Sequence, residues 1–493
     1  MTAVDHVVYK LSNISLILLL SLLWGGTIVV AKPNNGFSTQ LIHIFSPQSP
    51  LYPGNISYTE ENQLLLQQTN ARKRYIDATI AAALLSNNMS QSTKNPLDEL
   101  PRLKLEFYPY GMYIVQLGLG TFDAKFPAST FKTYYLYTDT GSQLIWTLCE
   151  DCLKQKPQPR CFQTRDPPFP NSQSKTYMPL PCGGHRLCKP GKCKGGICSM
   201  DSTYQDGSGV RTTLGSEAFS LLTTSGRARA IGNIVLGCAY DATADIFGAG
   251  EDYKVSGMLG LGYDPISFPN QISHLIDGAF SFCLTRRRDV QTYLRFGSDI
   301  PQPLGGVRVT PLVLSDLVPY YHVNLKAISV DGHKLLINPT VFEIRKRGTE
   351  GGCIIDNGSS FTLLINPAHQ ALVMYLQMHF LRYPSFNKVL PPIYPKFELC
   401  YNWSPPPREA NEALPTITFH FDGPNHPNID VAPESGFILM HDRSSNRDAL
   451  CLAFVPDDVR TIFGSWQLSD YRYIFDLKRS LLKFAPEDCA KNS

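Results

Sequence analysis

Two short segments of this chain each place an aspartate at the start of a glycine-containing turn. Asp139 begins Asp-Thr-Gly-Ser, and Asp356 begins Asp-Asn-Gly-Ser. Two carboxylates held close together cannot both ionise easily, so the pKa of one falls and the pKa of its partner rises. Such a pair can polarise a water molecule, with one carboxylate acting as base and the other as acid. The two aspartates are therefore candidates for peptide-bond hydrolysis without a metal or a covalent nucleophile.

The residues that follow each aspartate suit this chemistry. Gly141 and Gly358 would let the two backbones approach each other, because glycine has no Cβ. Ser142 and Ser359 could hydrogen-bond the carboxylates. A single Asp-x-Gly-Ser segment is usually a plain turn, so the evidence lies in the repetition of the segment.

Each copy of the segment follows an apolar run and precedes a second, apolar-apolar-Gly element. These second elements are Met258-Leu-Gly260 and Ile462-Phe-Gly464, at similar distances beyond their aspartates. An internal repeat of this kind predicts two related lobes, which we expect to join near residue 300.

The elements around these motifs are expected to be mostly strands. From Tyr113 onward, short β-branched and aromatic runs alternate with Gly and Pro, which predicts a mainly β protein with short helices, one of them near residues 366–381. Upstream, Thr59-Glu-Glu-Asn is expected to cap a helix that ends near Leu85. The expected divisions are a signal peptide at 1–31, a prosegment at 32–105, an N-terminal lobe at 106–300 and a C-terminal lobe at 301–493.

The N-terminus indicates the compartment. Lys10 precedes an apolar run that ends at Leu23, and small residues follow as far as Ala31, which is typical of a secretory signal peptide. A retained signal anchor is the alternative, but the apolar core is short for a membrane span. The formal net charge of +3 and the lack of a basic tract argue against nucleic acid as a partner. We expect a secreted protein that has no membrane contact after signal removal.

The cysteines indicate disulfides. All 13 lie at or after Cys149, which predicts a disulfide-bonded region behind a cysteine-free leader. Cys149-x-x-Cys152 could also be a zinc or redox motif, but there is no second CxxC to match it. We therefore expect no metal and no cofactor, and the odd total leaves one thiol without an internal partner.

Taken together, the motifs resemble those of the pepsin-family aspartic proteases, and most closely the plant nepenthesin-like branch. The stretches that carry this resemblance are Asp139-Thr-Gly-Ser-Gln-Leu-Ile-Trp146, Tyr204-Gln-Asp-Gly-Ser208, Ser256-Gly-Met-Leu-Gly-Leu-Gly262, Phe280-Ser-Phe-Cys-Leu284, Phe484-Ala-Pro-Glu-Asp-Cys489 and the segment from Gly36 to Pro50. The resemblance implies a bilobal pepsin-like fold, mainly β, with a central cleft and an N-lobe flap. It also implies a monomeric endopeptidase that cleaves extended peptides at acidic pH.

The resemblance also implies roles for individual residues. Tyr204 falls at the position of the flap tyrosine, and Trp146 at the position of its hydrogen-bond partner. The Thr140 hydroxyl is expected to reach across to the backbone of the opposite loop. Asn357 stands where family members carry Thr or Ser, and it could supply an amide donor instead. A catalytically weak or inactive binding protein on the same fold, similar to plant glycosidase-inhibitor homologues, is the alternative function.

Two further expectations rest on the same resemblance. The family pattern implies the disulfides Cys149–Cys152, Cys161–Cys238, Cys182–Cys198, Cys188–Cys193, Cys283–Cys489 and Cys400–Cys451, which leaves Cys353 as a buried thiol. In the prosegment, the cations expected to pair with cleft carboxylates and hold the enzyme latent are Arg72, Lys73, Arg74 and Lys104. Glycosylation sequons begin at Asn55, Asn88, Asn357 and Asn402, and we expect Asn357 to be unmodified.

Overall fold

The structure is a computed structural model of the chain. It describes residues 36–88, 113–123, 130–189, 191–203, 209–223, 228–242, 253–302, 305–315, 317–389, 397–404, 406, 409, 412–442 and 447–491. The predicted signal peptide, Lys104 and the flap residue Tyr204 lie outside these ranges.

The first large group of strands forms an N-terminal lobe. Its strands pair in the order β2, β3, β10, β4, β9, β8 and β7. Their bounds are β2 Tyr113–Leu119, β3 Lys132–Asp139, β4 Trp146–Leu148, β7 Ile197–Thr203, β8 Gly209–Leu222, β9 Ala228–Ala242 and β10 Val255–Gly260, and the short elements here are β5 Met178–Pro179, β6 Cys193–Lys194 and α3 Phe268–Gln271. Every residue of β10 is buried, because this strand lies between neighbours on both sides.

A second group forms the C-terminal lobe. The strands around Asp356 pair in the order β14, β19, β27, β20 and β26. The bounds of the lobe are β14 His322–Val323, β15 Leu325–Val330, β16 His333–Lys334, β17 Ile344–Arg345, β18 Glu350–Gly351, β19 Cys353–Ile355, β20 Thr362–Ile365, β21 Cys400–Asn402, β22 Ile417–Phe421, β23 Asn428–Val431, β24 Phe437–Asp442, β25 Arg447–Leu452, β26 Phe454–Asp457 and β27 Thr461–Phe463, with helices α4 Asn366–Phe380 and α6 Pro433–Gly436. The helix predicted near residues 366–381 is thus confirmed as α4.

A six-stranded antiparallel sheet joins segments from both ends of the chain. Its order is β1, β12, β11, β28, β29 and β13. The bounds are β1 Phe37–His43, β11 Ala279–Cys283, β12 Thr292–Phe296, β13 Arg308–Val313, β28 Tyr471–Asp476 and β29 Leu481–Pro486. Alternate residues of β12 are buried, and Phe296 stacks on Phe37 of β1 with ring centroids 4.7 Å apart. The segment predicted as a prosegment therefore contributes a strand to a central sheet.

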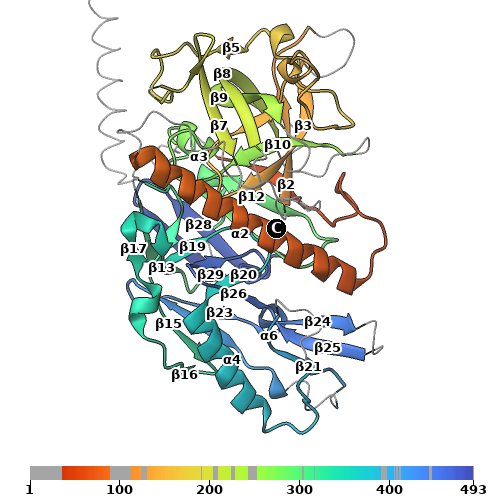
Figure 1. The fold of residues 1–493 in the computed structure, drawn as a ribbon, viewed down its shortest axis with the longest axis vertical. Coiled ribbons are helices and arrows are strands. Elements are labelled where there is room, and N and C mark those ends of the chain that lie inside the picture. The colour runs from red at the N-terminus through yellow and green to blue at the C-terminus, as the bar shows by residue number, and fades with distance from the viewer. Residues whose placement is uncertain are drawn as a thin grey trace, which may run out of the picture. The chain divides into compact units, whose positions relative to one another are not determined.

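The helix predicted upstream of the lobes is longer than expected and is capped two residues earlier. Helix α2 spans Tyr58–Asn88. The Ser57 hydroxyl accepts from the Glu60 amide (3.2 Å) and the Glu60 carboxylate accepts from the Ser57 amide (2.9 Å), which is a capping box. Thr59, the expected cap, instead accepts from the backbone amide of His441 (2.8 Å). In Figure 1, α2 runs diagonally in front of both groups of strands, and its contacts with β7 and β24 confirm that it reaches both lobes.

The disulfide map corrects part of the sequence-based expectation. Cys283–Cys489 and Cys400–Cys451 form as expected, and Cys353 is free and buried. The four N-lobe pairings were wrong: the structure has Cys149–Cys238, Cys152–Cys161, Cys182–Cys193 and Cys188–Cys198.

The physical reason for the first correction lies in the strand register. Strand β4 runs parallel to β9 with Leu148 opposite Ala239, and the Cys149 amide donates to the Ala239 carbonyl (3.2 Å). This pairing brings Cys149 beside Cys238, which precedes Ala239. Cys152 is then left for Cys161, whose neighbour Arg160 donates its amide to the Cys152 carbonyl (2.8 Å).

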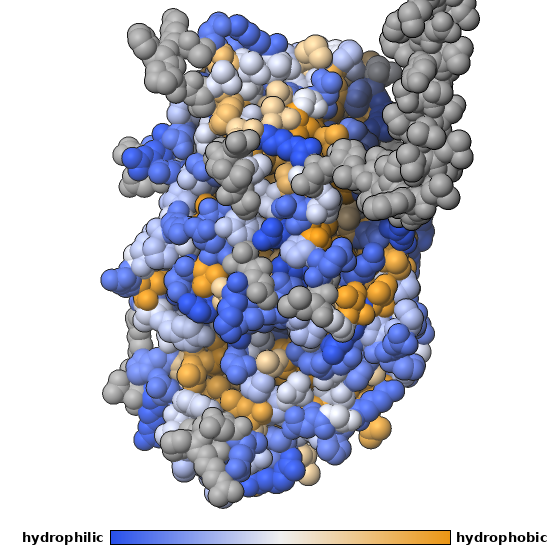
Figure 2. All heavy atoms as spheres, turned by 180° about the vertical axis from the view of Figure 1, so that it is seen from behind, coloured by the Kyte–Doolittle hydropathy of each residue, from blue (hydrophilic) through white to orange (hydrophobic). Residues whose placement is uncertain are grey.

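One face of the molecule is mostly polar where the structure describes it. Hydrophilic side chains cover most of the face seen in Figure 2, with hydrophobic residues in small groups between them. Among the described residues, no helix has an apolar stretch long enough to cross a membrane.

Candidate active site

The two predicted aspartates occupy equivalent places in the two lobes. Asp139 ends β3, where it lies opposite Gly260 of the parallel strand β10. Asp356 directly follows β19, whose last residue Ile355 lies opposite Phe463 of the parallel strand β27. Both aspartates also bond the backbone of the neighbouring chain segment: the Asp139 carbonyl accepts from Leu261 N (2.8 Å), and Asp356 N donates to the Phe463 carbonyl (3.1 Å). The repeated sequence motifs therefore correspond to a repeated supersecondary unit.

The glycines of both motifs are required by close approach between the loops. A Cβ on Gly141 would lie 2.8 Å from Asp356 Oδ1, and a Cβ on Gly358 would lie 2.6 Å from Asp139 Oδ1. Each glycine thus makes room for the carboxylate of the opposite loop. Gly260 and Gly464 allow a second close approach, between the end of each parallel strand and the chain just after each motif. A Cβ on Gly260 would lie 2.5 Å from the backbone of Gln143, and a Cβ on Gly464 would lie 2.7 Å from the backbone of Phe361.

Both carboxylates are buried and hydrogen-bonded by their own loops. The amide of Gly141 donates to Asp139 Oδ1 (2.8 Å), and the amide of Gly358 donates to Asp356 Oδ1 (3.2 Å). Ser359 donates its hydroxyl to Asp356 Oδ2 (2.7 Å), and Ser142 likewise donates to Asp139 Oδ2. These bonds fix the orientation of both carboxylates.

A cross-brace links the two loops, and it is asymmetric. The Thr140 hydroxyl accepts from the backbone N–H of Asn357 (3.0 Å) and donates to the backbone carbonyl of Ile355 (3.3 Å). In return, the Asn357 side-chain oxygen accepts from the Thr140 amide (2.8 Å). The sequence suggested that Asn357 supplies an amide donor, but its Nδ2 has no hydrogen-bond partner among the described residues and is buried. The Asn357 side chain therefore supplies the hydrogen-bond acceptor that a Thr or Ser hydroxyl would supply, but it does not supply the donor. Because the side chain is buried, there is no space for a glycan on it.

Arg72 of α2 lies between the two carboxylates. Its Nη2 is 2.6 Å from Asp139 Oδ1 and 3.1 Å from Asp356 Oδ1, and its Nε is 3.0 Å from Asp356 Oδ2. All three side chains are excluded from solvent. A planar guanidinium suits this bridging geometry because its donors have a fixed fork arrangement. The expected pairing of Arg72 with cleft carboxylates is thus present in the structure.

The environment moves the pKa values of the two carboxyl groups in opposite directions. Burial, helped by the neighbouring Asp356 charge, raises the pKa of Asp139 to about 6, although Arg72 opposes the shift. Burial also acts on Asp356, but there the charge and hydrogen bond of Arg72, with the bond from Ser359, outweigh it and lower the pKa. One carboxyl group therefore holds a proton more readily than its partner.

Three further α2 residues reach the same site. Gln68 accepts from the Ser360 amide (2.9 Å) and donates to the Gly358 carbonyl, and Thr69 accepts from the Phe361 amide (2.9 Å). Tyr75 lies with its hydroxyl 3.2 Å from the Ser142 hydroxyl. These residues were not predicted from the sequence, although they lie three or four positions from Arg72 and therefore share its helix face.

Of the other predicted residues, Lys73 pairs with Asp77 and Asp457, not with the catalytic candidates. The structure describes no ion pair for Arg74. Trp146 is buried in β4 opposite Met258, but its expected partner Tyr204 is outside the described residues.

Cys353 lies on the strand that leads to Asp356. It is fully buried, and burial raises the pKa of its thiol. A buried thiol that resists ionisation is a poor nucleophile, so Cys353 behaves as a small apolar residue.

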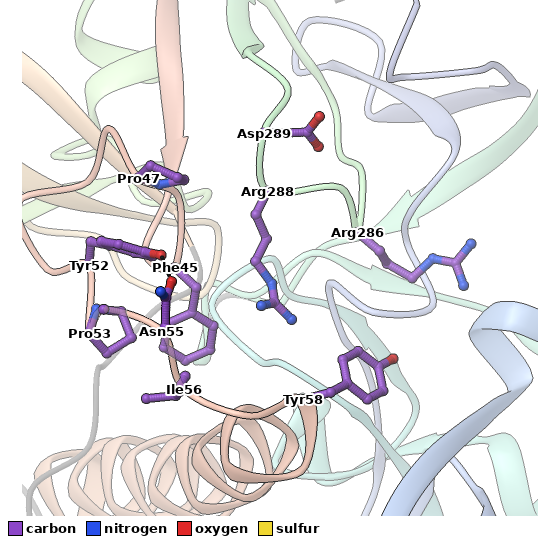
Figure 3. A pocket seen from close by; sticks show the side chains of 11 residues that line it. Phe45, Pro47, Tyr52, Pro53, Asn55, Ile56, Tyr58, Arg286, Arg288 and Asp289 are labelled. Carbon is purple, nitrogen blue, oxygen red and sulfur yellow. Dashed lines mark hydrogen bonds between the residues drawn. The ribbon is translucent and has the colours of Figure 1, made fainter.

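A separate pocket of about 500 Å³ lies where the segment between β1 and α2 meets the loop after β11 (Figure 3). Its lining includes Phe45, Tyr52, Tyr58, Arg286 and Arg288, and none of the candidate site residues. Arg288 forms an ion pair with the buried Glu61 of α2 and lies over the Phe45 ring. Within the described ranges, no group of three or more His, Cys, Asp or Glu residues is placed to hold a metal ion.

Comparison with known proteins gives consistent matches over both lobes. The family model described as Xylanase inhibitor N-terminal matches residues 113–298, and the one described as Xylanase inhibitor C-terminal matches residues 320–486. The chain is 30% identical over 436 residues to aspartyl protease family protein 2 of Arabidopsis thaliana, covering 86% of this chain and 80% of that protein. It is 28% identical over 389 residues to aspartic proteinase nepenthesin-1 of Nepenthes gracilis, covering 77% and 78%.

Solved structures show the same fold at lower sequence identity. The crystal structure of basic 7S globulin from soybean superposes with a TM-score of 0.55 at 20% identity, covering 76% of this chain and 95% of that one. The crystal structure of edgp gives a TM-score of 0.59 at 16% identity, covering 79% and 98%.

Proposed function

Since the chain belongs to the plant pepsin-like aspartic proteases, in the nepenthesin-like branch, we propose that it is an aspartic endopeptidase with Asp139 and Asp356 as its catalytic dyad. The observation that supports this most is the convergence of two buried carboxylates, each held by the glycine amide and the serine hydroxyl of its own loop. Such a pair is what acid–base catalysis on a water molecule needs.

The proposed reaction uses only the dyad and a water molecule. One carboxylate takes a proton as the water oxygen attacks the scissile carbonyl carbon, while the protonated partner donates to the carbonyl oxygen. The tetrahedral intermediate then breaks its C–N bond as a proton passes to the leaving amine. Ser142, Ser359 and the two loop glycines hold the carboxylates in position, and the Thr140–Asn357 brace holds the loops together.

Residues 32–105 act in this proposal as a prosegment that keeps the enzyme latent. Arg72 pairs with both carboxylates of the dyad, and Gln68, Thr69 and Tyr75 contact the loops that carry them. Helix α2 therefore covers the carboxylates and keeps a substrate peptide away from them. The six disulfides fit an oxidising compartment, which agrees with the proposed signal peptide at 1–31 and secretion. Exposed Asn55 is the best placed of the described sequons to carry a glycan.

The test is cleavage of an unfolded protein at pH 3–5 by the protein after removal of residues 32–105. We expect cleavage that pepstatin blocks, and no cleavage by the intact chain at pH 7. An intact chain that is fully active at pH 4 would contradict the latency proposal. A processed, folded protein that cleaves nothing would contradict the endopeptidase proposal itself.

A binding protein on the same fold is the second candidate. It is favoured by the matches to family models described as xylanase inhibitor domains and by the incomplete Asn357 brace. A processed protein that is inert as a protease but binds a xylanase in a pull-down would support this candidate.

A further inference from the structure

A second charged contact joins α2 to the C-terminal lobe beside the dyad. Lys73 Nζ lies 2.7 Å from Asp457 Oδ2 and 2.7 Å from Asp77 Oδ2 of the same helix. Asp457 ends β26, and its side chain is only 1% exposed, whereas that of Lys73 is 30% exposed. The lysine therefore reaches from the helix surface onto a carboxylate that belongs to the body of the lobe.

The Asp457 carboxylate is fixed in its orientation by the turn that follows it. Its Oδ1 accepts from the amides of Val459 (2.7 Å) and Arg460 (2.9 Å). Its Oδ2 faces α2, and Lys73 is the only partner described for this oxygen. An ionised carboxylate that is buried without a partner is costly, so the site requires a cation or water when the helix is absent.

The course of α2 links this carboxylate to the dyad. Lys73, which contacts Asp457, is the immediate neighbour of Arg72, whose guanidinium contacts both catalytic candidates. In the strands, Asp457 lies opposite Ile365 of β20, toward the other end from Asp356, so the helix and not the sheet joins the two sites. A peptide that replaced α2 over the dyad and followed the same course would therefore pass close to Asp457.

One neighbouring cation must be considered. Arg460 is buried, and its Nη2 is held by the Thr349 carbonyl (2.9 Å) and lies 3.6 Å from Asp77 of α2. Its Nε and Nη1 are buried and have no hydrogen-bond partner among the described residues. Lys73, and not Arg460, forms the ion pair with Asp457 Oδ2, so the carboxylate remains available for an incoming cation as long as Arg460 keeps its bond to Thr349.

We propose that Asp457 forms a specificity pocket for a lysine or arginine side chain of the substrate, and that Lys73 fills this pocket in the unprocessed chain. The proposal rests on the endopeptidase activity proposed above. In this proposal Asp457 selects the substrate, and the dyad hydrolyses the peptide bond.

The test uses the processed enzyme and paired peptides that differ only in one residue, lysine or leucine, placed in turn at each position around the cleaved bond. Asp457→Asn keeps the shape and the Oδ1 acceptor of the turn but removes the charge. At one position we expect kcat/KM for the lysine peptide to fall about tenfold in this variant, and kcat/KM for the leucine peptide to change less than about twofold.

Asp458→Asn is the matched control, because Asp458 is the exposed neighbour of Asp457 and should change neither peptide. An equal loss on both peptides, or an unchanged ratio, would overturn the pocket. If Asp457→Asn fails to fold, the residues found around the bonds that the wild-type enzyme cleaves provide the test. If lysine and arginine are not enriched at any position near the cleaved bond, the proposal is overturned. Absence of all cleavage by the wild-type enzyme would instead refute the endopeptidase activity, and the pocket with it.

Discussion

The loops that carry Asp139 and Asp356 have nearly the same backbone but different surroundings. Each aspartate lies at or just after the end of a strand, and the parallel neighbour of that strand ends at or just before a glycine, Gly260 or Gly464. Each aspartate also accepts from the amide two residues later and from the serine three residues later. They differ in the brace residue, Thr140 or Asn357, and in Arg72, which makes one contact with Asp139 and two with Asp356. The sheets thus create the symmetry, and a single side chain and a docked helix break it.

The strongest test of this comparison removes each carboxylate in turn. Asp139→Asn and Asp356→Asn should each lower kcat of the processed enzyme by at least about a thousandfold, because neither carboxylate can act as both base and acid. Thermal unfolding should show both variants folded, and Asp458→Asn should keep full activity. Near-normal turnover by either dyad variant would show that the loops are not a catalytic pair.

Removal of Arg72 should have the next largest effect. Arg72→Leu leaves two carboxylates buried without their cation, so the free energy of unfolding of the intact chain at pH 7 should fall by about 3–5 kcal/mol. Asn70→Ala, on the same helix but away from the dyad, is the control. Urea denaturation measures both. A loss in Arg72→Leu no larger than in the control would mean that the bridge does not hold α2.

The pH dependence of that loss follows from the two pKa shifts. The pKa of Asp356 is lowered, so its pairing with Arg72 stabilises the docked state above about pH 4 and is lost as pH falls through the lowered pKa. Burial and the Asp356 charge raise the pKa of Asp139 to about 6 against the effect of Arg72, so Asp139 takes up a proton as pH falls below 6 and its ion pair with Arg72 weakens first, while that of Asp356 persists. The intact wild-type chain should therefore stay docked from pH 7 to pH 5 and release α2 only below about pH 4. Release that is complete at pH 5.5 would contradict this.

A smaller effect is expected from making the two brace residues alike. Asn357→Thr would remove a buried donor without a partner and restore a hydroxyl that can both accept and donate, as Thr140 does. We expect a gain of about 1–3 kcal/mol in unfolding free energy and at most a tenfold rise in kcat. The mirror change, Thr140→Asn, should lose stability. A loss in both variants would show that Asn357 is fitted to its own network.

The smallest effect is expected three residues before each aspartate. Leu136 of β3 lies three residues before Asp139, and Cys353 of β19 lies three residues before Asp356; both side chains are buried. Cys353→Ala should lower the unfolding free energy by about 1 kcal/mol and leave kcat unchanged, because the thiol acts only as packing. Mild alkylation of the native enzyme should not reduce activity; a loss would give Cys353 a chemical role.

The sequence predicts the two Asp-x-Gly-Ser loops well, because their requirements are local and appear twice. Arg72 was one of four cations named as partners of the buried carboxylates, and the sequence did not single it out, because the face that α2 turns toward the loops makes that selection. The N-lobe disulfides were not, because eight cysteines within ninety residues allow many pairings and strand register selects among them. Nor was the direction of the Asn357 bond, which depends on the opposite loop.

The strand β1 has a consequence for how inhibition would end. Because β1 is paired with β12 and β2 and buried, it fastens the prosegment to the enzyme independently of the helix. A cut downstream of α2 would leave the helix tethered through residues 44–57, at a high effective concentration that dilution cannot lower. A cut within residues 44–57 alone would leave the helix joined to the enzyme through the chain that runs from α2 to β2. Only cuts on both sides of α2 would make rebinding bimolecular, so the same enzyme could be self-inhibited at any dilution after one cut and freed by dilution after two.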